Sequence, residues 1–95
     1  MSLTQQLANI GSEVGRVRAW YERDEKILSN AARRTFELFD LTIADPRWRG
    51  RGREIVRARE VFSDAILGGL EYGISLAEVE RYFLAFAIAS RRATF

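Results

Sequence analysis

The chain has 95 residues, 47% of them hydrophobic, and a formal net charge of +2. This length corresponds to one domain, spanning residues 1–95, and the hydrophobic fraction excludes a disordered chain. The sequence contains no cysteine and no histidine, which excludes disulfides, cysteine nucleophiles, and the usual general base and transition-metal ligand.

The first predicted element is a helix that begins at Ser2. Ser2 followed three residues later by Gln5 is typical of a capping box. The apolar residues that follow alternate in steps of four and three; they are Leu3, Leu7, Ile10, Val14, Val17 and Tyr21. This heptad spacing predicts lengthwise packing against another helix. Gly11 and Gly15 lie beside this stripe, where they would allow a close approach of the two backbones.

Two further helices are predicted in the middle of the chain. The second runs from about residue 25 to residue 43, with Asp24 as its N-cap. Its predicted inward face comprises Leu28, Ala32, Phe36 (or Thr35), Phe39 and Ile43, and Ala31, Leu38 and Thr42 widen it. Asp45-Pro46 indicates a break and a new helical turn, because proline cannot continue a helix. A third helix is predicted from near Gly52, and its core face comprises Ile55, Ala58, Phe62, Ala65 and Ile66.

The fourth helix has the clearest start. Ser75 is the predicted N-cap, and Glu78 completes a second capping box. The predicted fold class is therefore all-α, a small up-and-down helical bundle of about four helices.

The fourth helix is apolar nearly all round from residue 82 to residue 89. A helix in a small domain normally buries one stripe, and soluble monomers rarely expose large apolar patches. We therefore expect a homodimer, and the predicted self-interface comprises Tyr82, Leu84, Phe86 and Ile88. The alternative is a monomer in which the fourth helix is central.

Basic charge is concentrated between Arg47 and Arg59. This segment holds six arginines and one acid, so its net charge is +5, and that of the rest of the chain is −3. The predicted surface for an anion or a partner comprises Arg47, Arg49, Arg51, Arg53 and Arg57. An acidic protein partner or the phosphates of nucleic acid would suit it. The alternative is a solvated face whose arginines pair with neighbouring acids, with Trp48 in the core.

A short segment offers a second route to nucleic acid. Gly73-Ile74-Ser75, followed by Val79 and Arg81, resembles the turn and early recognition helix of the helix-turn-helix motif. That resemblance implies DNA binding by a helix that also carries Glu78 and Glu80, which phosphate would repel. The capping box at Ser75 accounts for the same residues.

No catalytic motif is found. Acidic pairs such as Glu37 with Asp40 and Glu60 with Asp64 have a spacing that is expected on any solvated helix. We expect no enzymatic activity, no catalytic residue, no cofactor and no metal site.

The sequence thus predicts a non-enzymatic, homodimeric helical protein-interaction module, with a small nucleic-acid-binding accessory or regulatory protein as the alternative. The longest uncharged run near the C-terminus, Tyr82 to Ser90, has nine residues, whereas a membrane span needs about 20. The N-terminus has no pattern of a signal peptide. We therefore expect a cytoplasmic protein without a membrane partner.

Overall fold

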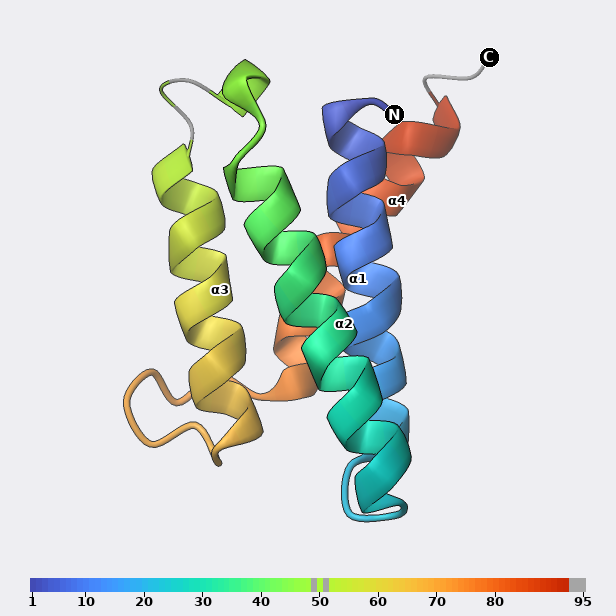
Figure 1. The fold of residues 1–95 in the computed structure, drawn as a ribbon, viewed down its shortest axis with the longest axis vertical. Helices are drawn as coiled ribbons and strands as arrows, with labels where there is room; N and C mark the ends of the chain where they lie inside the picture. Colours follow the sequence, from blue (N-terminus) through green and yellow to red (C-terminus); the bar gives the residue numbers. More distant parts are fainter. Residues whose placement is uncertain (49, 51, 93–95) are drawn as a thin grey trace.

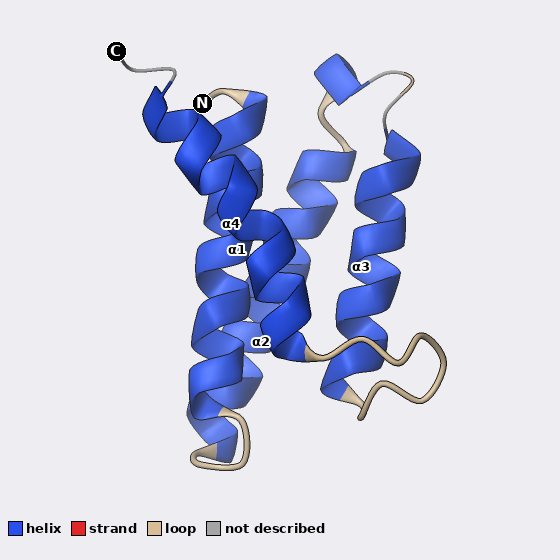
Figure 2. Cartoon of the chain, turned by 180° about the vertical axis from the view of Figure 1, so that it is seen from behind, coloured by secondary structure: helices blue, strands red, loops and turns tan. Residues whose placement is uncertain are grey.

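The chain folds as the predicted all-α bundle. The structure, a computed structural model, describes residues 1–48, 50 and 52–92. Its elements are α1 (Leu3–Trp20), α2 (Glu25–Ile43), the short 3-10 helix η1 (Pro46–Trp48), α3 (Gly52–Ile66) and α4 (Leu76–Arg92). Successive α-helices run in opposite directions (Figure 1), and α4 crosses α1 at an angle on the back of the bundle (Figure 2).

Side-chain caps fix the starts of three helices, as the sequence predicts. The Ser2 hydroxyl accepts a hydrogen bond from the Gln5 backbone, and the Gln5 side chain accepts one from the Ser2 backbone, at 3.1 and 2.9 Å. The Asp24 carboxylate accepts from two backbone N–H groups at the start of α2. The Ser75 hydroxyl accepts from the Glu78 backbone at 3.1 Å. Each cap satisfies donors that have no partner inside the helix.

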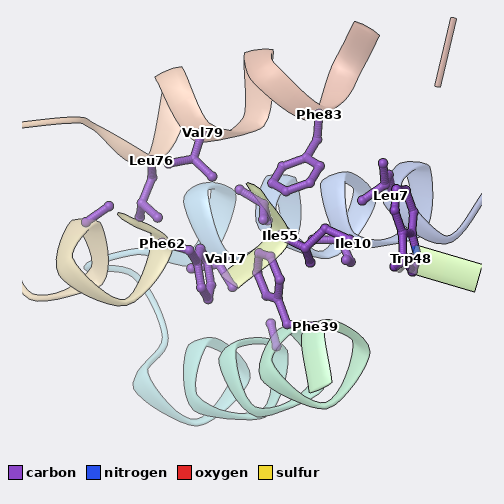
Figure 3. Packing of buried hydrophobic residues seen from close by; sticks show 13 residues of the cluster. Leu7, Ile10, Val17, Phe39, Trp48, Ile55, Phe62, Leu76, Val79 and Phe83 are labelled. Carbon is purple, nitrogen blue, oxygen red and sulfur yellow. The ribbon is translucent and has the colours of Figure 1, made fainter. Parts of the chain in front are cut away.

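The core is built around three phenylalanines from three helices. Phe39, Phe62 and Phe83 are almost completely buried, and the ring centroid of Phe39 lies 5.8 Å from those of both others. Figure 3 shows Phe83 pointing from α4 and Phe39 from α2 into the space between these helices, with Phe62 nearby. The heptad stripe of α1 also contributes to the core. Its buried residues are Leu7, Ile10, Val14 and Val17. The stripe of α1 is therefore covered within one chain.

The buried face of α2 differs from the predicted one. Its buried residues are Ala31, Thr35, Phe39 and Thr42. The predicted Leu28, Ala32, Phe36 and Ile43 lie at the edges of the core and are only partly buried. Each buried threonine hydroxyl donates to the carbonyl one turn earlier, at 2.8 Å. These bonds reduce the cost of burying a hydroxyl. Of the two alternatives, Thr35 is fully buried, and Phe36 is partly buried against the core.

The helices are packed unevenly. α1 has extensive contacts with α4 and with α2, whereas α3 has far fewer neighbours in α2 and α4. At the crossing of α1 and α4, a Cβ atom added at Gly11 would lie 2.6 Å from the Phe83 Cβ. Gly11 therefore permits the close approach that the sequence predicts, and α1, α2 and α4 form the tightly packed part of the bundle.

The connection between α3 and α4 is long and is fixed by hydrogen bonds to the end of α3. It runs from residue 67 to residue 75, and its three glycines all have positive φ angles. The Asp64 carboxylate accepts hydrogen bonds from the Glu71 and Tyr72 backbones, at 3.1 and 3.0 Å. A helix-turn-helix motif has a turn of about 3–4 residues. The longer connection therefore contradicts that resemblance.

Candidate functional site: a groove between two helices

A groove of about 650 Å³ lies between α3 and α4. Its apolar lining comes from both helices and from the end of their connection; it comprises Ala58, Val61, Ile74, Val79, Tyr82 and Phe83. We call this the α3–α4 groove. The sparse packing of α3 against α4 leaves the space between the two helices only partly filled. An open apolar groove is a typical place for a ligand or a partner segment to bind.

An adjoining hollow of about 400 Å³ extends the groove toward the start of α1. Ala58, Tyr82 and Phe83 line both spaces. The extension adds Leu3, Leu7, Trp48 and Phe86 to the apolar surface. Thr4 and Glu54 also line this extension, so it is only partly apolar. The two spaces together form one trough along α4.

The rim of the groove is charged. Arg53 and Arg57 lie one helical turn apart on α3, and neither takes part in the ion pairs found among the described residues. The Arg57 guanidinium lies 5.7 Å from the centre of the Tyr72 ring. Glu54 on α3 and Glu78 on α4 also line the groove. The lining therefore carries two arginines and one glutamate on α3 and a second glutamate at the start of α4.

Tyr82 is the polar group on the α4 wall. Partial burial raises the pKa of its hydroxyl above the ordinary value, and the Glu54 carboxylate adds to that rise. The hydroxyl is therefore neutral at physiological pH and can donate a hydrogen bond to a bound partner.

The predicted arginine surface divides into groups with different surroundings. Arg47 forms an ion pair of 2.7 Å with Asp45 and donates to the Met1 carbonyl at 2.9 Å, so it joins η1 to the start of α1. Arg53 and Arg57 lie on the groove. Arg49 and Arg51 lie outside the described residues.

The alternative of arginines paired with neighbouring acids holds for part of the segment. Besides Arg47, Arg59 pairs with Asp40 at 2.9 Å and lies over the ring of Phe36. Trp48 is buried in the core, and its indole N–H donates to the Gln6 side chain at 3.2 Å. Within the part of the chain that the structure describes, the groove arginines Arg53 and Arg57 are thus the basic pair of this segment without a carboxylate partner.

The predicted self-interface residues lie on two sides of α4. Tyr82 lines the α3–α4 groove, and Phe86 is partly buried against the core beside it. Leu84 lines a second hollow, between α1 and α4, of about 720 Å³. Tyr82, Leu84 and Ile88 are exposed by 49, 55 and 44%. The single chain therefore leaves both flanks of α4 partly uncovered.

The hollow between α1 and α4 is lined mainly by small side chains. They are Ala8, Gly11, Ser12, Gly15, Ala77 and Ala87, and Leu84 rises beside them. We call this surface the α1–α4 face. A projecting leucine next to a shallow hollow is the kind of shape that can pack against a copy of itself.

Sequence reasoning missed Val61 and Ile74 as lining residues. Val61 falls outside the predicted core face of α3, and Ile74 was given no role beyond the start of α4. The exposure of Val61 and Ile74 depends on the distance between α3 and α4, and no local sequence pattern indicates that distance. The pair Glu60 and Asp64 also has a structural role: Glu60 accepts from the Tyr72 hydroxyl at 3.2 Å, and Asp64 fixes the connection.

The surface gives no sign of metal chemistry or of a membrane span in the regions that are described. No group of three or more potential metal-ligating side chains comes together in residues 1–48, 50 and 52–92. Over the same residues, no helix has the length and hydrophobicity that crossing a bilayer requires. The chain matches no known family, no curated protein and no solved structure.

Proposed function

We propose that the chain is a non-enzymatic helical protein-interaction module that forms a homodimer and binds an acidic partner. The observation that carries this proposal is the α3–α4 groove, an apolar trough with Arg53 and Arg57 on its rim. Apolar surface supplies most of the binding free energy at such sites, and charged groups on the rim select the partner. Two arginines without carboxylate partners in the described structure favour a partner that brings carboxylates.

The homodimer rests on the other flank of α4. Leu84 and Ile88 lie one turn apart and are both about half exposed. A stable dimer buries about 800 Å² per partner, so its interface would have to include the small residues of the α1–α4 face. A two-fold arrangement would place Leu84 of each copy against the hollow of the other. Tyr82 and Phe86 lie on the opposite flank of α4, so they would line the groove and not the dimer interface.

The dimer is tested by Leu84→Glu, with Leu41→Glu as a matched control. Leu41 is an exposed leucine of α2, 67% accessible, and it lies outside both surfaces. We expect Leu84→Glu to give a monomer by sedimentation at tens of micromolar, with the helical circular dichroism retained. Leu41→Glu should remain a dimer. A wild-type chain that sediments as a monomer under these conditions contradicts the dimer.

Nucleic-acid binding is the second candidate, because the segment from Arg47 to Arg59 has a net charge of +5. It predicts affinity that falls steeply with salt, since each phosphate contact releases counterions. Random duplex and single-stranded DNA, and an acidic peptide of glutamate and leucine, should be titrated at two salt concentrations. Peptide binding without DNA binding supports the protein-interaction module. Binding of DNA alone, lost in Arg53→Gln/Arg57→Gln, supports the second candidate.

A further inference from the structure

We infer that the occupant of the α3–α4 groove is a single amphipathic α-helix of a partner protein, with carboxylates spaced one turn apart along one edge. This inference rests on the proposed function, because it specifies the conformation and charge pattern of the acidic partner. It combines the apolar lining of the groove with the placement of Arg53, Arg57 and Glu78 on its rim.

The apolar lining favours a helix over an extended segment. The walls of the groove are helices, whose backbone N–H and C=O groups are paired within each helix. An extended peptide would bring unpaired backbone groups onto an apolar surface, which is costly. A helix pairs its own backbone groups and presents only side chains, as in other helix-in-groove complexes.

The length of the trough sets the length of the helix. Arg53 and Val61 mark the extent of the lining along α3, which corresponds to about 12 Å at about 1.5 Å per residue. The adjoining hollow at Phe86 and Leu3 adds about another turn. A partner helix of about three turns, with apolar residues at every third or fourth position, would therefore cover the apolar surface.

The rim specifies where the partner carries charge. Arg53 and Arg57 are four residues apart, so carboxylates at positions i and i+4 of a helix alongside α3 would match them. Glu78 at the α4 rim and Glu54, which lines the groove on α3, would repel acids placed away from the two arginines. The partner is thus acidic on one edge only, and a uniformly acidic helix would bind less well.

The probe is a synthetic peptide of about 14 residues, about four turns, with leucines on one stripe and glutamates spaced four apart along one edge. Its controls are a peptide of equal length and charge in which one central neutral residue is replaced by proline, and a peptide with glutamine for glutamate. Binding is followed by calorimetry at low salt, and chemical shifts of Ala58, Val61 and Ile74 report whether the peptide lies in the groove.

Protein variants separate charge from fold. Arg53→Gln/Arg57→Gln removes the basic rim, whereas Arg16→Gln/Arg33→Gln removes equal charge from exposed positions of α1 and α2. We expect the first pair to weaken the helical peptide by about tenfold, because exposed ion pairs contribute modestly. The second pair should change affinity by less than about twofold. The proline peptide should bind about a hundredfold more weakly, because proline interrupts the helix.

The outcomes divide as follows. Tight binding of the helical peptide, in the groove and dependent on Arg53 and Arg57, supports the inference. Equal binding of the helical and proline peptides overturns the inference but leaves an acidic partner in place. Failure of both peptides to bind the folded chain overturns the inference and the proposed acidic partner together. A peptide that changes the chemical shifts of residues in the α1–α4 face only also overturns the inference, because it would bind elsewhere. Dissociation of the dimer by Tyr82→Ser overturns it as well, because the groove would then be part of the dimer interface.

Discussion

Asp45 is the residue whose charge is most strongly coupled to the fold. Its carboxylate accepts from the Arg47 side chain, the Arg47 backbone and the Gln6 side chain, so it links η1 to α1. The hydrogen bonds from Arg47 make the largest contribution to holding the pKa of Asp45 well below its ordinary value, and the hydrogen bond from Gln6 lowers it further. The charged form is therefore the one that the folded structure stabilises.

Asp45→Asn should accordingly change how stability depends on pH. Because the pKa of Asp45 is lower in the folded than in the unfolded chain, its carboxylate stabilises the fold above about pH 4. That contribution is lost as the pH falls toward the folded-state pKa. We expect the variant to have a lower urea midpoint than the wild type at pH 7 and a progressively smaller deficit below about pH 4. The control is Glu71→Gln, which removes a carboxylate that forms no ion pair in the described residues. If that variant lowers the urea midpoint by the same amount and with the same dependence on pH, the prediction is contradicted.

At the scale of helices, the crossing of α1 and α4 depends on one glycine more than on the other. A methyl group at Gly11 would meet the Phe83 Cβ, which is held by the backbone of α4. A methyl group at Gly15 would meet the end of the Glu80 side chain, which can move away at the expense of its exposed ion pair with Arg18.

Gly11→Ala and Gly15→Ala should therefore differ in stability. Overpacking costs about 1–3 kcal/mol, and alanine restores about 1 kcal/mol of helix propensity. We expect Gly11→Ala to lower the free energy of unfolding by about 1–2 kcal/mol. Gly15→Ala should change it by less than about 1 kcal/mol, because an exposed ion pair is worth little. Denaturation followed by circular dichroism measures both, and equal losses would show that the crossing is not set at Gly11.

The elements themselves were largely predictable from local patterns. Capping residues at Ser2, Asp24 and Ser75 mark helix starts because each satisfies backbone donors within a few residues. The stripe of α1 is regular enough to identify its buried residues. The face of α2 was harder, because hydrophobicity alone favours Phe36 over Thr35, and only the hydroxyl's bond to Ala31 makes threonine acceptable in the core.

The candidate site was predictable only in part. The concentration of arginine pointed to Arg53 and Arg57, but no local pattern separates them from Arg47, which pairs with Asp45. The groove depends on how far α3 stands from α4. Asp64 fixes the connection through its bonds to Glu71 and Tyr72, but the placement of α3 against α4 is a long-range consequence of folding and leaves no periodic signal in the sequence.

For the whole molecule, the uneven packing implies that the bundle does not open as one unit. α3 has few neighbours in α2 and α4, whereas α1 is packed extensively on two sides. Segments with few buried contacts open with lower free energies than the global value. We expect amide hydrogens of α3 to exchange through a partial opening that leaves α1 and α4 protected. Exchange of α1 and α3 at a single common rate would contradict this expectation.

The sparse attachment of α3 also makes it a reporter of occupancy. A ligand that contacts both α3 and α4 binds the closed form only, so it raises the free energy of opening, by about 2.7 kcal/mol at a hundredfold excess over its dissociation constant. Amide protection would then rise in α3 and hardly at all in α1. The slowing of exchange along this one helix would identify a natural ligand in a mixture without any label on either molecule.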